Sequence, residues 1–108
     1  MTDQSLAFAA LGDPTRRAIF EHVAHRPQSV GKLAEHFEVS RPAVSQHLRV
    51  LKDAGLVRDQ KDGTRRIYAL ELNGVMAMRT YLDRFWDQAL SSFAAEANRD
   101  AEEEEETT

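Results

Sequence analysis

The stretch SRPAVSQHLRVLKDAGLV, residues 40–57, constrains the fold more than any other part of the chain. Ser40 is a residue type that caps helix N-termini, and Pro42 falls in the first turn, where a missing N–H costs little. Gly55 stands where many helices end in a left-handed conformation. The sequence therefore predicts a helix that starts at Ser40 and ends at Ala54.

This helix has two chemically different faces. At 100° per residue, the apolar side chains of Val44, Leu48 and Leu51 fall on one side, which predicts a buried stripe. Gln46 and Arg49 fall on the opposite side, and these residue types can pair with adenine and guanine in the major groove of DNA. A polar face that meets only water is the plain alternative. The groups that could meet DNA are Ser40, Arg41, Pro42, Ser45, Gln46 and Arg49.

Three shorter helices are expected before this one. Hydrophobic spacing and capping residues predict helices over about residues 3–11 and 13–26. Ser29 can cap a third helix of about two turns, and a tight turn then leads to Ser40. A short helix, a tight turn and a second helix form a helix-turn-helix arrangement.

A β-hairpin and a long helix are expected after it. Residues 56–60 and 65–70 predict two strands, and the Asp62-Gly63 pair between them is a strong hairpin signal. A last helix should run from Asn73 to about residue 98. The predicted fold is mainly α with a small β-hairpin (α+β), in the order α-α-α-α-β-β-α. Such a hairpin after a helix-turn-helix is a wing, and its basic residues are Lys61, Arg65 and Arg66.

The charge of the chain is unevenly distributed. The net charge is −4, but the final segment alone holds six carboxylates, Asp100 and residues 102–106. Residues 32–66 contain eight basic and five acidic residues, so the middle of the chain is mildly basic and suits a nucleic-acid partner. The acidic end has nothing to bury. We therefore expect one domain over residues 1–98 and a disordered tail over residues 99–108.

Several classes of protein are excluded or disfavoured. The chain has no cysteine, which excludes disulfides and thiolate metal sites. No apolar run approaches the ~20 residues of a membrane span, and the N-terminus does not resemble a signal peptide, so a cytoplasmic protein without a membrane partner is expected. No nucleophile–base pair or Gly-rich phosphate loop is present. We therefore expect no catalytic residues, no cofactor and no enzymatic activity.

The histidines are the remaining candidates for metal chemistry. His22 and His25 are three residues apart on one predicted helix, a spacing that can chelate a metal. No third ligand is obviously convergent, so partly exposed helix histidines are the favoured interpretation and no metal site is predicted. His47 borders the buried stripe of its helix and is expected to be structural.

The segments LGDPTRRAIF, SVGKLAEHFEVSRPAVSQHLRVLKDAGLV and DGTRRIYAL together resemble the ArsR/SmtB family of bacterial winged-helix repressors. The resemblance covers roughly Leu6 to Phe93. It implies a homodimer in which the first and last helices pair, a recognition helix beginning at Ser40, and repression of a promoter. Two features depart from the family: Glu38 stands where many such turns carry glycine, and the ligands of the metal sensors are missing. The inducer is therefore left open, as a small molecule or a protein.

The last predicted helix is rich in aromatic residues. Tyr81, Phe85, Trp86 and Phe93 are four of the eight aromatics in the chain. A dimer seam would bury them, and an effector pocket is the alternative. With the pairing that the resemblance implies, the expected dimer interface consists of Leu6, Leu11, Met78, Leu82, Phe85, Trp86, Leu90 and Phe93.

The sequence thus favours a homodimeric transcriptional regulator that binds double-stranded DNA at an inverted repeat and represses its own or a neighbouring promoter. Ser45, Gln46 and Arg41 would read bases. A winged-helix module that docks another protein, with weak or no DNA binding, is the alternative. The residues expected to support DNA binding from the third helix and the wing, mainly through phosphates, are Lys32, Lys61, Arg65 and Arg66.

Overall fold

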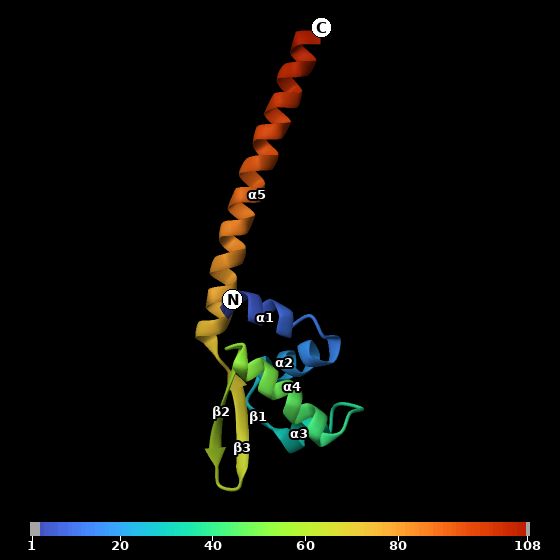
Figure 1. Ribbon diagram of the computed structural model, residues 1–108, viewed down its shortest axis with the longest axis vertical. Helices are drawn as coiled ribbons and strands as arrows, with labels where there is room; N and C mark the ends of the chain where they lie inside the picture. The colour runs from blue at the N-terminus through green and yellow to red at the C-terminus, as the bar shows by residue number, and fades with distance from the viewer. Residues whose placement is uncertain (1–2, 108) are drawn as a thin grey trace. The chain divides into compact units, whose positions relative to one another are not determined.

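The computed structural model describes residues 3–107 (Figure 1). The described chain divides into two compact units, one ending at Met78 and one beginning at Arg79. Helices dominate, and two of the three strands of a small antiparallel sheet follow the fourth helix. The elements are α1 (Asp3–Ala10), α2 (Pro14–His25), β1 (Gln28–Ser29), α3 (Val30–Ala34), α4 (Arg41–Asp53), β2 (Val57–Asp62), β3 (Arg65–Leu70) and α5 (Leu72–Thr107).

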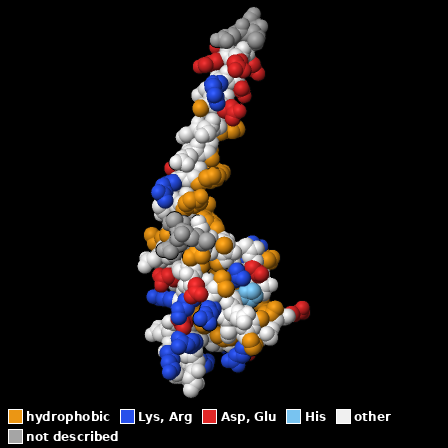
Figure 2. All heavy atoms as spheres, viewed as in Figure 1, with side chains coloured by type: hydrophobic (Ala, Val, Ile, Leu, Met, Phe, Trp, Pro, Cys, Tyr) orange, Lys and Arg blue, Asp and Glu red, His pale blue; other side chains and the backbone are white. Residues whose placement is uncertain are grey.

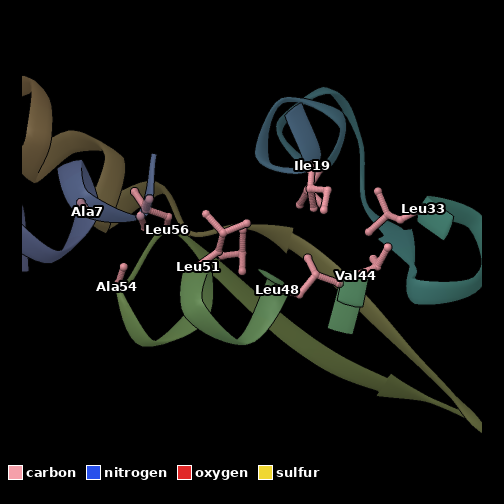
Figure 3. Packing of buried hydrophobic residues seen from close by; sticks show 11 residues of the cluster. Ala7, Ile19, Leu33, Val44, Leu48, Leu51, Ala54 and Leu56 are labelled. Atoms are coloured by element: carbon pink, nitrogen blue, oxygen red, sulfur yellow. The ribbon is translucent and has the colours of Figure 1, made fainter. Parts of the chain in front are cut away.

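The core of the first unit lies where α2, α3 and α4 meet. Figure 3 shows Ile19, Leu33 and Val44, one from each helix, pointing toward a common centre. Leu48 and Leu51 extend this cluster along α4 and are fully buried. The apolar stripe that helical spacing predicts on α4 is therefore confirmed. It fixes which face of α4 remains outside.

Side-chain caps define where the helices begin. The Asp13 carboxylate accepts a hydrogen bond of 2.9 Å from the Arg16 N–H at the start of α2. Ser29 and Ser40 cap α3 and α4 in the same way, each at 3.2 Å. The predicted caps are confirmed, but α3 has only five residues and is shorter than expected. Since every described residue with a positive φ is a glycine, Glu38 needs no left-handed conformation in the turn.

The sheet contains a strand that the sequence analysis did not predict. β1 pairs antiparallel with β3, opposite Tyr68 and Ile67, and the strand order is β1-β3-β2. The order of elements is therefore α-α-β-α-α-β-β-α. A two-residue strand has no periodicity to detect, which is why it was missed. The predicted hairpin is confirmed, with Asp62 opposite Arg65 and Gly63 at φ +64° in the turn.

The chain passes from α4 into the sheet and α5 through a close contact between two glycines. Gly55 ends α4 in the expected left-handed conformation, at φ +79°. A Cβ placed on Gly74 would lie 1.8 Å from the Gly55 carbonyl oxygen, so only glycine fits there. α5 begins at Leu72, one residue before the expected start at Asn73, and the Asn73 N–H donates to the Glu71 carboxylate at 3.3 Å.

The second unit is the remainder of α5. Its side chains are exposed throughout residues 79–105. The helix continues to Thr107 through the segment expected to be disordered. Alanine, arginine and glutamate are good helix formers, and a helix that is already formed needs no new nucleus to extend. Figure 2 shows acidic side chains gathered toward the C-terminal end of this helix.

Candidate nucleic-acid interface

α4 presents a polar outer face opposite its buried stripe. Gln46 and Arg49 are exposed, as their helical positions predict, and Arg41, Pro42 and Ser45 are exposed as well. Ser40 is exposed as well, with its hydroxyl oxygen engaged in the cap. Because the apolar stripe is fully buried, the helix is held rigidly with these groups outward.

Arg41 reaches sideways toward α3. A Cβ placed on Gly31 would lie 3.4 Å from Arg41 Nη2, so the guanidinium lies directly beside the Gly31 backbone. The Arg41 side chain therefore runs along α3 rather than straight outward from the first turn of α4. Arg41 bridges the two helices of the helix-turn-helix and remains exposed to solvent.

The strand β3 separates two grooves with different basic residues. Arg65 lies on the side of β1 and α3, in a groove that also contains Arg26 and Lys32. Arg66 lies on the side of α4, in a groove of about 500 Å³. Lys61 is exposed on β2, opposite Arg66. The structure thus brings Lys32 together with Arg65, and Arg49 together with Arg66. The second groove is lined by Ser45, Arg49, Lys52, Asp53, Asp59, Arg66 and Tyr68.

An acidic residue organises the groove between α4 and the wing. Lys52 Nζ lies 2.8 Å from Asp59 Oδ1, and Arg66 Nη1 donates to Asp59 Oδ2. The Asp59 side chain is only 7% exposed, whereas Lys52 and Arg66 are 50% and 59% exposed. Hydrogen bonds from Lys52 and then Arg66 hold the pKa of Asp59 below its usual range, although burial opposes this. Asp59 and Lys52 could not be found from the sequence, because their contact depends on how the wing meets α4.

The structure pairs His22 with His36, rather than with His25 on the same helix. The His22 ring stacks on His36, with 5.1 Å between ring centroids, and meets Phe37 edge-on. Among the side chains that the structure describes, residues 5–105, no three histidines or carboxylates converge as metal ligands would. His47 is half-buried, and it helps the Arg16 N–H to lower the pKa of Asp13. This places His47 beside the start of α2.

The residues expected at a dimer interface fall into two groups. Leu11 and Met78 are partly buried and pack against the core of the first unit. The other six are exposed, up to 63% for Trp86 and 73% for Phe93. Apolar surface of this size along one helix is typical of a face that binds a partner. The exposed members are Leu6, Leu82, Phe85, Trp86, Leu90 and Phe93.

Comparison with known proteins connects this geometry to a function. A helix-turn-helix domain model matches residues 11–60. The chain is 59% identical over 88 residues to the HTH-type transcriptional regulator Rv2034 of Mycobacterium tuberculosis, covering 82% of each protein. It is 40% identical over 63 residues to the transcriptional repressor SdpR of Bacillus subtilis, covering 58% of this chain and 70% of SdpR. An ArsR-like transcriptional regulator from Rhodococcus sp. RHA1 superposes with a TM-score of 0.73 at 32% identity, over 84% of this chain and 89% of that one.

These relatives are transcriptional regulators, a class without enzymatic activity. Within the described residues, no helix is long and apolar enough to cross a membrane. In helix-turn-helix proteins the second helix of the motif lies in the major groove of DNA, and α4 is the second helix of this arrangement here. The protein is a DNA-binding transcriptional regulator, and the chain belongs to the ArsR/SmtB family of winged helix-turn-helix proteins.

Proposed function

We propose that the protein is a homodimeric repressor that binds an inverted repeat in its own or a neighbouring promoter, within the cytoplasm. The observation that carries the proposal is the division of α4 into a fully buried apolar stripe and an exposed polar face. A helix held in this way presents fixed hydrogen-bonding groups, which reading of base edges requires.

The polar face of α4 would read bases near its N-terminal half. Gln46 is well suited to adenine, and Ser45 and Arg41 can contact neighbouring bases. Ser40 and Pro42 would lie close to the DNA backbone at the start of the helix. Arg49 would bind phosphate beside them. The residues proposed to bind phosphate from α3 and the wing are Lys32, Lys61, Arg65 and Arg66.

The exposed apolar face of α5 supports the dimer. Phe85, Trp86 and Phe93 each leave more than half of their surface in water. Burying such side chains against a second copy stabilises association by roughly 25 cal/mol for each Å² of apolar surface removed from water. A twofold axis would place two copies of α4 about 34 Å apart, which matches half-sites one helical turn apart.

The direction of regulation is supported by a relative. SdpR, which is 40% identical to this chain over 63 residues, is a transcriptional repressor. A dimer bound across promoter DNA would exclude RNA polymerase. A reporter gene placed behind the upstream region of the protein's gene should fall in expression when the protein is supplied, and a rise would make it an activator.

Selection of bound sequences from a random DNA pool tests the proposal. We expect a palindrome whose half-sites are separated by one helical turn. Recovery of a single, asymmetric site would contradict the dimeric readout, and no enrichment would favour a module that docks proteins. The same selection with added zinc tests the expectation that no metal site is present.

A further inference from the structure

The groove between α4 and the wing contains an anion where a DNA-binding surface would be expected to avoid one. Asp59 lies on β2, under the exposed cations Lys52 and Arg66. Each oxygen of the Asp59 carboxylate holds one of them. Arg49, which belongs to the proposed DNA-binding face, lines the same groove.

Charge alone makes this arrangement unfavourable for DNA. A carboxylate beside a phosphate repels it, and the pairing of Asp59 with two cations reduces the positive potential of the groove. Ion pairs on a surface usually contribute little to stability. Asp59 is different because its side chain is 7% exposed and depends on these two partners for compensation.

The ion pairs of Asp59 can also favour DNA binding, because they hold Lys52 and Arg66 in place. Lysine and arginine have long side chains that lose conformational freedom when they bind a phosphate. The carboxylate fixes the position of Lys52, which is anchored on α4, and of Arg66, which is anchored on β3, before DNA arrives. It also connects the wing to α4, so that both elements meet the DNA backbone as one rigid surface.

We propose that Asp59 is a positioning residue: it holds Lys52 and Arg66 beside Arg49 so that the groove accepts one backbone phosphate of double-stranded DNA. The inference rests on the proposed placement of α4 and the wing on DNA. It adds Lys52 and Asp59 to the DNA-binding surface. Asp59 acts through the two cations and makes no contact with the phosphate itself.

The proposal and simple electrostatics predict opposite changes in DNA affinity when Asp59 is replaced. Asp59→Asn removes a negative charge from the groove, so simple electrostatics predicts tighter DNA binding. If Asp59 positions the cations, the variant should instead bind about three- to tenfold more weakly, as expected when one or two long side chains lose their preorganisation. The slope of log Kd against log salt should also become shallower by about one, for the lost phosphate contact.

Asp53→Asn is the matched control. Asp53 lines the same groove, and among the described residues it forms no ion pair. Its replacement removes the same charge without releasing a cation, so binding should stay the same or tighten by about twofold or less. Urea unfolding of both variants checks that each protein is folded at the temperature of the binding assay.

The same Asp59→Asn substitution in a protein that lacks both cations separates positioning from an effect on folding. With Lys52→Gln and Arg66→Gln in place, nothing remains for Asp59 to position. Adding Asp59→Asn there should no longer weaken binding and should leave it equal or tighter. A loss of the same size in both backgrounds would mean that Asp59 acts only through the fold, which would overturn the proposal.

Binding is measured by fluorescence anisotropy on a duplex of arbitrary sequence at low salt. Phosphate contacts do not depend on sequence, so this probe reports on the groove even if no specific operator is found. Weaker binding of Asp59→Asn than of Asp53→Asn, with the shallower salt slope, supports the proposal. Equal or tighter binding of Asp59→Asn overturns it. Failure of the proposed function would appear separately, as a lack of enriched sequence in the random-pool selection.

Discussion

The helices α4 and α5 both carry an apolar stripe, but the stripe of α4 is buried and that of α5 is exposed. On α4 the stripe of Val44, Leu48 and Leu51 is fully buried within its own unit. On α5 beyond Met78 the corresponding stripe is open, with Phe85 and Trp86 more than half exposed. Because the apolar side of α4 is buried in the core, the polar side of this helix is exposed and free to contact a ligand. The exposed apolar face of α5 is the surface that we propose a second copy of the chain covers.

The same substitution on the two helices should have very different consequences. Leu48→Ala opens a cavity in the core and should lower the free energy of unfolding by about 2–5 kcal/mol. Leu90→Ala removes a side chain that is 51% exposed and should leave the stability of the first unit unchanged. Urea denaturation followed by far-UV circular dichroism at low protein concentration measures both. Equal decreases in the free energy of unfolding would mean that Leu48 and Leu90 contribute alike to the fold, contrary to their different burial.

A charge on the apolar face of α5 should break the dimer and leave the first unit folded. Phe85→Glu places a carboxylate in the proposed seam and should weaken self-association by about 2 kcal/mol or more, as expected for the loss of an aromatic anchor. Analytical ultracentrifugation over a range of concentrations gives the dissociation constant. Ser91→Glu adds the same charge at an exposed position on the other side of the same helix and serves as the control. Unchanged association of Phe85→Glu would mean that this face does not form the dimer.

The junction between α4 and α5 should tolerate only glycine. Gly74→Ala would place a methyl group 1.8 Å from the Gly55 carbonyl oxygen, so the backbone must shift. Overpacking of this kind costs about 1–3 kcal/mol, whereas an alanine in an exposed helix ordinarily stabilises it. Thermal unfolding of Gly74→Ala and of Asn73→Ala, its exposed neighbour, measures the difference. A Gly74→Ala protein as stable as the control would contradict the close approach.

The smallest expected effect concerns acid stability of the first unit. The Arg16 N–H holds the pKa of Asp13 below its usual value of 3.8. A lowered pKa contributes stability above the unfolded value, and this contribution is lost as the pH falls through the folded value. Asp13→Asn keeps an N-cap acceptor but removes the titration. We therefore expect its stability to fall less steeply than that of wild type below about pH 4, as measured by urea titrations at several pH values. Parallel curves would show that Asp13 does not titrate in this way.

Local chemistry explains which parts of the fold could be predicted. The caps at Ser29 and Ser40, the buried stripe of α4 and the glycine after it follow from residues within one or two turns of each other. The strand β1 could not be predicted, because two residues have no period and their partner lies on β3. The approach of Gly74 to Gly55 also joins positions far apart in the chain.

The candidate site shows the same division. The outward set on α4 followed from helical angles alone, and its exposure is confirmed. The pairing of Asp59 with Lys52 and Arg66 depends on the way the wing meets α4, so it was invisible in the sequence. α5 extends through its acidic end, which was expected to be disordered, because the helix propensity of alanine and glutamate outweighs the repulsion between the carboxylates.

The central claim is that the polar face of α4 reads bases while its apolar face only holds it in place. A scan of every base-pair substitution in the selected operator, with wild type and Gln46→Ala, tests this most directly. Gln46→Ala should lose about 1–3 kcal/mol of discrimination at one symmetry-related pair of positions and keep it elsewhere. Discrimination by Gln46→Ala equal to that of wild type at every position would contradict the account.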